Sequence, residues 1–123
     1  MPTEAQHLQK AQHNEAFLAT FDLITSRYLD WAVTATFYAA LHYLRALMAK
    51  HRYTNVSNYG DVDVAFNRID ILKRNPPIYD AYRNLKDESW AARYNMWVPR
   101  PPDVVDLRDN ELQRIRDFVR ANL

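Results

Sequence analysis

The sequence predicts an all-α fold, an up-and-down bundle of four long helices with one short helix inserted between them. The chain of 123 residues contains a single glycine, Gly60, whereas hairpins, sandwiches and barrels need glycine for their turns and bulges. Long segments repeat apolar residues at spacings of three and four, which is the period of an amphipathic helix. The length predicts one domain over residues 1–123, with no room for a second.

The first two helices are predicted over residues 4–25 and 28–52. Thr3 and Gln6 have the spacing of a capping box, in which each side chain satisfies a free backbone N–H of the first turn. The apolar face of the first helix consists of Leu8, Ala11, Leu18 and Phe21. The second helix is rich in alanine and leucine and apolar around most of its circumference, so we expect it at the centre of the bundle.

Proline and asparagine residues mark the remaining helices. A short helix is predicted over 61–74, where Asn75 and Pro76 end it and begin the next one. That long helix is predicted over 76–97, before a proline-rich stretch, and the last helix is predicted over 103–121. The apolar face of the last helix is expected to consist of Val105, Leu112, Ile115 and Val119.

The composition excludes several classes of function. The chain has no cysteine, which excludes a disulfide scaffold, a cysteine nucleophile and the common structural zinc sites. One glycine excludes a glycine-rich phosphate loop. His7 and His13 lie six residues apart without an acidic residue at ligand spacing, so neither a metal site nor a cofactor is expected. The formal net charge of +1 produces no global positive field for nucleic acid.

No targeting or membrane-spanning segment is predicted. The first ten residues are polar and lack the apolar core of a signal peptide. The most apolar stretch, from Trp31 to Leu44, covers 14 residues and contains two threonines and a histidine. It is too short and too polar to cross a bilayer. We therefore expect a cytoplasmic protein with no membrane partner.

Polar side chains form stripes on two of the predicted helices. The second helix carries Trp31, Thr34, Tyr38, His42 and Arg45 at spacings of three and four, and the fourth carries Tyr82, Lys86, Ser89, Arg93 and Trp97 in the same way. Residues at these spacings share one face of a helix. If the two helices pack antiparallel along these stripes, His42, Arg45, Ser89 and Arg93 come into one neighbourhood.

These stripes allow two interpretations. In the first, the polar groups satisfy one another or the backbone, and the two arginines reach the rim or pair with Asp87 or Glu88. In the second, they line a groove for a phosphate-bearing ligand, with aromatic rings, Trp97 among them, stacking on bases. The candidate ligand-binding residues are then Tyr38, His42, Arg45, Ser89, Arg93 and Tyr94.

Two motifs on these helices resemble those of small bacterial HEPN-domain proteins. Residues 30–42 read Asp-Trp-Ala-Val-Thr-Ala-Thr-Phe-Tyr-Ala-Ala-Leu-His, similar to the second-helix signature of that family. Residues 82–85 read Tyr-Arg-Asn-Leu and residues 89–94 read Ser-Trp-Ala-Ala-Arg-Tyr, similar to its fourth-helix pattern. The resemblance covers about residues 10–120. It implies a helical bundle that forms homodimers and either binds RNA or a nucleotide or acts as a metal-independent ribonuclease.

The family's ribonucleases carry an arginine followed, four to six residues later, by a histidine near the start of a late helix. This chain has no histidine after His51, so Arg93 lacks such a partner. Arg45 and His51 have the spacing, but they lie at the end of the second helix, where a basic residue also complements the helix dipole. The candidate catalytic residues are His42, His51, Arg45 and Arg93.

Three hypotheses follow for the function. The leading one is a non-catalytic HEPN-type protein that binds RNA, a nucleotide or a nucleotidyltransferase-type partner in bacterial defence or a toxin–antitoxin system. The second is a metal-independent endoribonuclease that uses His42 or His51 for proton transfer, with Arg45 or Arg93 on the phosphate. The third is a dimerisation or interaction module, whose surface is formed by surplus aromatic residues. These are Trp31, Phe37, Trp90, Tyr94 and Trp97.

Overall fold

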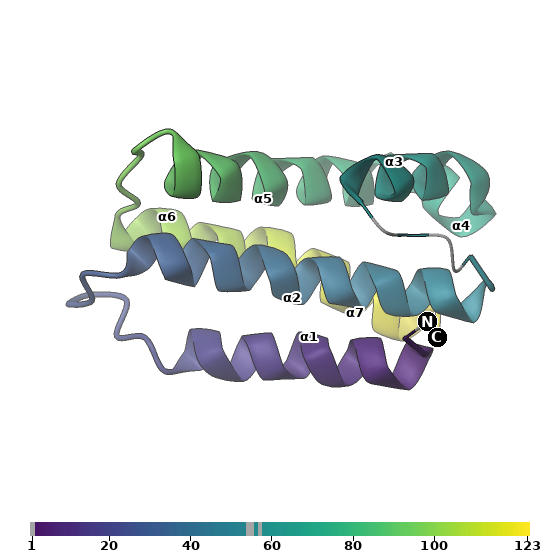
Figure 1. Cartoon of the computed structure of the whole chain (residues 1–123), viewed down its shortest axis with the longest axis horizontal. Coiled ribbons are helices and arrows are strands. Elements are labelled where there is room, and N and C mark those ends of the chain that lie inside the picture. Colours follow the sequence, from purple (N-terminus) through teal and green to yellow (C-terminus); the bar gives the residue numbers. More distant parts are fainter. Residues whose placement is uncertain (1, 54–55, 57) are drawn as a thin grey trace.

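The computed structural model describes residues 2–53, 56 and 58–123, and every regular element in this part of the chain is a helix. The prediction of an all-α class is therefore confirmed. In chain order the elements are α1 (Glu4–Ala19), α2 (Leu29–Lys50), α3 (Tyr59–Arg68), α4 (Asp70–Lys73), α5 (Pro76–Tyr94), α6 (Pro101–Asp106), the π-helical segment η1 (Leu107–Leu112) and α7 (Gln113–Ala121) (Figure 1).

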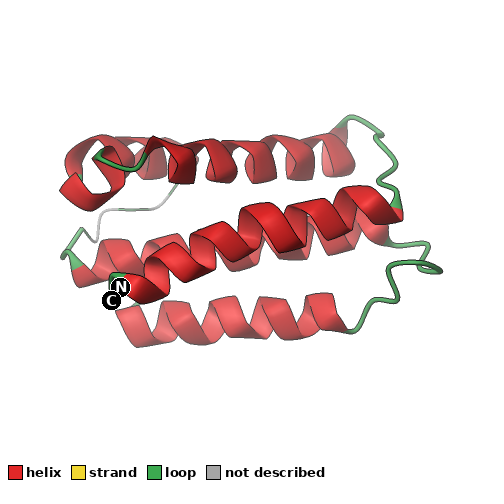
Figure 2. Ribbon diagram, turned by 180° about the vertical axis from the view of Figure 1, so that it is seen from behind, coloured by secondary structure: helices red, strands yellow, loops and turns green. Residues whose placement is uncertain are grey.

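The long helices lie alongside one another and alternate in direction. Helix α2 is central, with α1 along one side and α5 along the other (Figure 1). Helices α6 and α7 and the segment η1 between them form one continuous rod, which packs against both α2 and α5. Seen from behind, this rod crosses in front of α2 (Figure 2). The short helices α3 and α4 lie beside the start of α5 (Figure 1).

Helix α2 is the centre of the hydrophobic core. Fifteen of its 22 residues are buried, so it touches neighbours around most of its circumference, as the sequence predicts. Its alanines are among the most completely buried side chains, and their small size lets the flanking helices approach closely. Four of them, Ala32, Ala39, Ala40 and Ala46, have no exposed surface.

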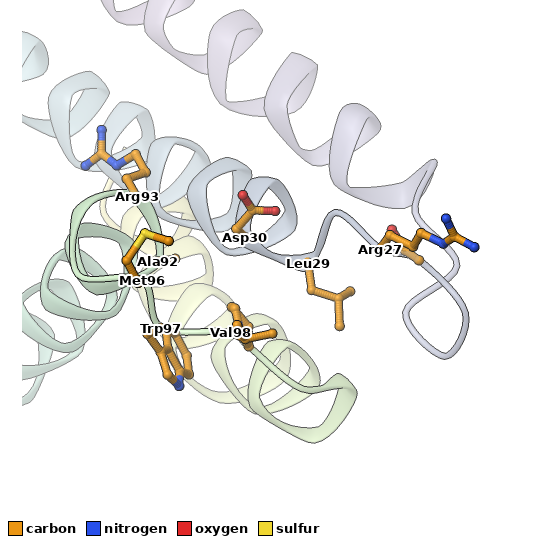
Figure 3. Close-up of a pocket in the computed structure, with 10 residues that line it drawn as sticks. Arg27, Leu29, Asp30, Ala92, Arg93, Met96, Trp97 and Val98 are labelled. Atoms are coloured by element: carbon orange, nitrogen blue, oxygen red, sulfur yellow. The ribbon is translucent and has the colours of Figure 1, made fainter.

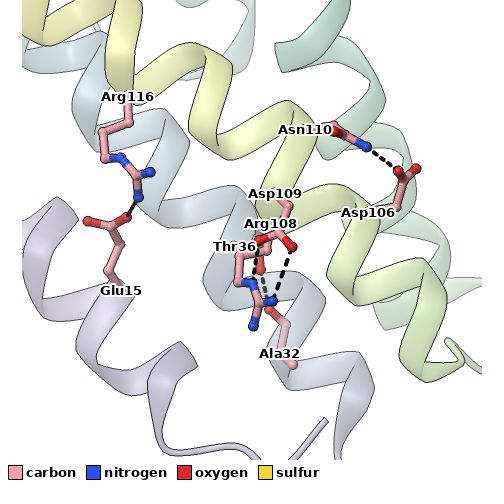
Figure 4. Close-up of polar contacts among 8 residues, drawn as sticks. All are labelled: Glu15, Ala32, Thr36, Asp106, Arg108, Asp109, Asn110 and Arg116. Carbon is pink, nitrogen blue, oxygen red and sulfur yellow. Dashed lines mark hydrogen bonds and ion pairs between the residues drawn. The ribbon is translucent and has the colours of Figure 1, made fainter. Parts of the chain in front are cut away.

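A partly buried polar cluster joins α1, α2 and α7. The hydroxyl of Tyr43 on α2 donates to Glu15 on α1 at 2.5 Å and accepts from Arg120 on α7 at 3.2 Å. Arg116, also on α7, donates to the same carboxylate at 2.7 Å (Figure 4). Burial and the Glu15 carboxylate raise the pKa of Tyr43 to about 12, so this phenol stays a hydrogen-bond donor. The cluster satisfies polar groups that packing alone would leave unpaired.

Two long helices end earlier than predicted. Helix α1 stops at Ala19 instead of residue 25, because the Asp22 side chain accepts from the backbone N–H groups of Ile24 and Thr25 and forms a competing turn. Helix α5 stops at Tyr94 instead of residue 97. Met96 there adopts a left-handed backbone with φ of 59°, which reverses the chain.

The predicted short helix over 61–74 is two helical pieces in the structure. Ile69, between α3 and α4, has an extended backbone with ψ of 116°, which interrupts the helix. The Ile69 side chain is buried, so the residue that interrupts the helix also contributes an apolar side chain to the core.

The last helix begins at Pro101 and contains a π-helical segment that the sequence analysis did not anticipate. Its core-facing residues are Val104, Leu107, Leu112, Ile115 and Val119, whereas Val105 is 37% exposed, contrary to the prediction. The buried residues Leu107 and Leu112 are five residues apart. In a regular α-helix the residue four positions after Leu107, which is Glu111, would face the core in place of Leu112. The wider π turn therefore keeps both apolar stretches on the core side.

Within the described residues, no helix has both the length and the apolar character needed to cross a bilayer.

The C-terminus of α2 offers a test of backbone strain. Arg52, which follows the C-cap His51, has a left-handed backbone with φ of 58°. The N–H of Tyr53 donates to the carbonyl of Met48 at 2.9 Å, and the N–H of Arg52 donates to the carbonyl of Ala49 at 2.9 Å. This is a Schellman motif, in which glycine is usual at the position of Arg52.

We expect Arg52→Gly to be more stable than Arg52→Ala by about 1 kcal/mol, because both variants lose the charge but only glycine adopts this conformation without strain. Urea unfolding monitored by circular dichroism measures the difference. Equal unfolding free energies for the two variants would show that this position is not strained.

Candidate functional site

The side chains of α2 that remain partly exposed in the middle of the helix lie on one stripe. They are Trp31, Tyr38, His42 and Arg45. Four of the five residues predicted for this stripe are therefore at least partly open to solvent. Thr34, the fifth, is buried, and its hydroxyl donates to the carbonyl of Asp30 at 2.9 Å. Contacts of the stripe with α1 on one side and α5 on the other place it between these two helices.

The first part of the site is a tyrosine–arginine group formed by Tyr38, Tyr59, Arg93 and Tyr94. Arg93 Nη1 on α5 donates to the hydroxyl of Tyr38 on α2 at 3.1 Å, and this hydroxyl lies 3.4 Å from that of Tyr59 on α3. The guanidinium also lies over the rings of Tyr38 and Tyr94, at 5.6 and 5.2 Å from their centroids. Its Nε donates to the carbonyl of Ser89 at 3.3 Å. The group holds one cation against two aromatic faces.

A second cation lies beside this group. The ammonium of Lys86 on α5 is 5.4 Å from the centroid of the Tyr59 ring. Burial, and then the hydrogen bond with Tyr38, raise the pKa of Tyr59, so its hydroxyl remains protonated near neutral pH. A neutral phenol between two cations can donate a hydrogen bond to an anion without adding negative charge.

The second part of the site is a histidine pair formed by His7 on α1 and His42 on α2. Their Nδ1 atoms lie 3.1 Å apart and share a hydrogen bond, so one nitrogen carries the proton and the other accepts it. Burial, followed by the charges of His7, Arg45 and Lys10, lowers the pKa of His42 to about 4. Burial and Arg45 also lower the pKa of His7. Both imidazoles are therefore uncharged near neutral pH.

Arg45 lies close enough to the histidine pair to lower the pKa of both imidazoles, and Lys10 lowers that of His42. Every charged neighbour that shifts these two pKa values carries positive charge. Within the described part of the chain, Arg45 and Arg93 form no ion pair with a carboxylate, and Arg45 Nε is buried without a hydrogen-bond partner. The alternative expectation, that Arg45 or Arg93 pairs with Asp87 or Glu88, is not met among the described residues, where Asp87 instead pairs with Arg83 at 4.0 Å.

The predicted neighbourhood divides into two adjoining groups. Tyr38 and His42 lie one turn apart on α2, so the tyrosine–arginine group and the histidine pair are consecutive along the same stripe. Ser89 is fully buried; only its carbonyl contacts Arg93, and its hydroxyl has no partner among the described residues. His51 is exposed beyond the end of α2, and no hydrogen bond between described residues joins it to Arg45.

Three contributors to the site were missed by the sequence analysis: His7, Lys10 and Tyr59. His7 carried a usable signal, since it precedes the buried Ala11 by four residues and so lies on the inward face of the first helix. Tyr59 carried none, because it follows a polar loop and is brought to the stripe by the packing of α3.

A pocket of about 440 Å³ adjoins the tyrosine–arginine group. It lies between the start of α2 and the segment that follows α5, with Leu29 and Asp30 on one side and Trp97 and Val98 on the other (Figure 3). Arg93 lies at its edge, with its guanidinium directed away from Trp97 (Figure 3). The volume falls within the range of small-molecule sites.

The site is unsuited to a cation. The described residues contain no group of three His, Asp or Glu side chains that could hold a metal ion. Arg45 and Lys10 place positive charge near the histidine pair, which disfavours a bound cation and favours an anion.

The chain matches no protein-family model, no curated protein and no solved structure in the comparisons made with each. The family suggested by the two sequence motifs therefore stays a prediction. The function has to be argued from the geometry and the electrostatics of the site.

The lowered pKa of His42 predicts a pH-dependent stability. In the unfolded chain His42 has the ordinary histidine pKa of 6.5, so it binds a proton as the pH falls below that value. In the folded protein it binds this proton only when the pH approaches 4. Stability should fall as the pH decreases from about 6.5 to about 4. His42→Gln should reduce this loss, measured by urea unfolding at pH 7 and pH 4.5.

His13→Gln is the matched control, because this histidine is exposed on α1 and its removal should leave the pH dependence unchanged. An NMR titration of the His42 ring with a midpoint near 6.5 would contradict the prediction.

Proposed function

We propose that this protein is a non-catalytic HEPN-type helical bundle that binds a phosphate-bearing ligand, RNA or a nucleotide, on the α2 stripe between α1 and α5. The observation that carries the proposal is a pair of arginines, Arg45 and Arg93, that lie on this stripe or against it without carboxylate partners among the described residues. Arginine presents several donors in a planar fork, which matches the oxygens of a phosphate.

Several features of the stripe support an anionic ligand. The buried Nε of Arg45 has no hydrogen-bond partner among the described residues, and an unpaired buried donor is costly unless an acceptor reaches it. Lys10 and Lys86 add positive charge on the flanking helices. The ring of Tyr94 is 60% exposed beside Arg93 and offers a face on which a base can stack.

The cellular role that we propose rests on the resemblance of residues 30–42 and 82–94 to HEPN proteins. On this resemblance we propose that the chain acts in the cytoplasm, in a bacterial defence or toxin–antitoxin system. The partner would be a second copy of the chain or a nucleotidyltransferase-type protein.

A binding experiment tests the ligand. Wild-type protein should bind a fluorescein-labelled single-stranded oligoribonucleotide, measured by fluorescence anisotropy, and leave it intact in EDTA. The double variant Arg45→Gln, Arg93→Gln should bind roughly 100-fold more weakly, because each arginine contributes a charge-assisted hydrogen bond. The slope of log K against log salt should become shallower by about 0.7 for each phosphate that the variant no longer neutralises.

Arg114→Gln is the control for net charge, since it removes an exposed arginine from α7, outside the stripe. It should bind RNA with nearly wild-type affinity. If it weakens binding as much as the double variant does, only a general electrostatic attraction exists. If no variant changes the affinity, the stripe is not the binding site.

The histidine pair favours a second candidate function, a metal-independent endoribonuclease. Two imidazoles in one hydrogen bond beside Arg45 could transfer protons while a guanidinium stabilises the phosphorane. Cleavage in EDTA that yields 2′,3′-cyclic phosphate ends and is lost in His42→Ala would support this candidate over simple binding. Loss of cleavage in His51→Ala would instead assign proton transfer to His51.

Exposed aromatic side chains favour a role in self-association. Trp90 and Tyr94 on α5 are 50% and 60% exposed, and their rings lie 4.5 Å apart between centroids. Met96 and Val98, which follow them in the chain, are more exposed still. Phe37, which the sequence analysis also assigned to such a surface, is buried in the core, and Trp97 is half-buried against it. Large exposed aromatic pairs are typical of interface hot spots.

We expect the wild-type protein to sediment as a dimer at micromolar concentration in analytical ultracentrifugation. The double variant Trp90→Glu, Tyr94→Glu should sediment as a monomer, because two buried charges would oppose association. Val64→Glu, which adds a charge to an exposed apolar position on α3, is the control and should remain dimeric. A monomeric wild-type protein would contradict this part of the proposal.

A further inference from the structure

A second pocket lies at the corner where α1 leads into α2, and its walls are aromatic. It has a volume of about 470 Å³ and is lined by the rings of Phe17, Phe21, Tyr28 and Trp31. Phe17 and Phe21 meet edge to face, with 5.0 Å between their centroids. None of these residues belongs to the tyrosine–arginine group or to the histidine pair, so this pocket is a separate feature.

Phe21 packs against the hydrophobic core, but the other three rings are more exposed than core packing requires. Phe17 is 47% exposed, Tyr28 is 63% exposed and Trp31 is 52% exposed. Ring surface left in water contributes nothing to folding, whereas burial of an aromatic side chain is one of the larger stabilising terms. Several partly exposed rings around one hollow are better explained by a ligand than by packing.

The charge on the pocket wall is negative. Asp22 is the one charged residue among those that line the pocket, the others being Thr20, Ser26 and the four aromatic residues. The backbone N–H groups of Ile24 and Thr25 donate to its Oδ1 and lower the pKa of this carboxyl, so Asp22 is ionised near neutral pH. Arg27, close in sequence, lines the neighbouring pocket instead, and its guanidinium points away from Leu29 (Figure 3).

We propose that the aromatic pocket at the α1–α2 corner binds a small organic cation that carries a quaternary trimethylammonium group. The negative faces of the rings attract such a cation, and the Asp22 carboxylate on the pocket wall complements its charge. A quaternary trimethylammonium group has no N–H donors and is weakly hydrated, so it loses little on leaving water. A primary ammonium is strongly hydrated and gains less from a ring face.

The charge of the pocket argues against other small ligands. A phosphate or carboxylate would face the ionised Asp22 without a compensating cation in the lining. A purely apolar ligand would use the rings but leave the carboxylate without a role. The proposal does not depend on phosphate binding at the α2 stripe. Trp31 is the one residue named in both, because it stands at the beginning of the stripe and its ring lines the pocket.

The test uses choline and its uncharged isostere 3,3-dimethyl-1-butanol, which have the same shape and differ in charge. NMR titration of the folded protein, followed on the indole N–H signal of Trp31, should give saturable binding of choline about tenfold tighter than of the isostere, a difference of about 1.4 kcal/mol. Ethanolamine, a primary ammonium of related structure, should also bind about tenfold more weakly than choline.

Two variants test the named residues. Asp22→Asn removes the charge but keeps an oxygen that can accept from Ile24 and Thr25, so it should fold normally and bind choline several-fold more weakly. Trp31→Leu should abolish saturable binding, monitored on the backbone signals of Phe17 and Tyr28. Val64→Ala, which changes an exposed apolar side chain of α3 outside this pocket, is the control and should bind choline normally.

Three results would overturn the proposal: no saturable binding of choline, equal binding of choline and 3,3-dimethyl-1-butanol, or binding that Asp22→Asn and Trp31→Leu leave unchanged. Circular dichroism of each variant confirms that a loss of binding does not come from a loss of fold.

Discussion

The burial of α2 is the constraint on which the rest of the structure depends. This helix has no broad solvent face, because small and apolar side chains cover most of its circumference and bring α1, α5 and the C-terminal rod against it. One narrow stripe is left uncovered, between α1 and α5. Between the two ends of α2, a polar side chain has to lie there, be buried with a partner as Tyr43 is, or bond its own backbone as Thr34 and Thr36 do. The position of the candidate site is therefore a consequence of core packing.

The distribution of carboxylates explains why the site is electropositive in a chain with almost no net charge. The acidic side chains that form ion pairs in the described residues do so elsewhere, as Glu15 does with Arg116 and Asp109 does with Arg108 (Figure 4). None of these pairs reaches the stripe. Arg45 and Arg93 therefore have no carboxylate partner among the described residues.

The sequence predicts the helical class and the central helix, because hydrophobic period and composition are local properties. The neighbourhood that it predicts for His42, Arg45, Ser89 and Arg93 is divided in the structure, where Arg93 contacts Tyr38 and His42 pairs with His7. The helix ends were misplaced where a single side chain or backbone angle decides, as with Asp22 and Met96. Tyr59 was missed because it reaches the stripe only through the tertiary packing of α3, whereas His7 was missed although its spacing to the buried Ala11 places it on the inward face of α1.

The π-helical segment in the C-terminal rod has a consequence for how this chain should be aligned with others. It accommodates one residue more than a regular helix would between Leu107 and Leu112. A homologue with an unbroken α-helix at this place would lack one residue among positions 108–111, and a gapless alignment would then shift every later position by one. The inward-facing Ile115 and Val119 would be paired with solvent-facing residues, and the similarity would be hidden over the C-terminal end of the chain, residues 112–123. A single-residue gap opened inside this helix restores the correspondence.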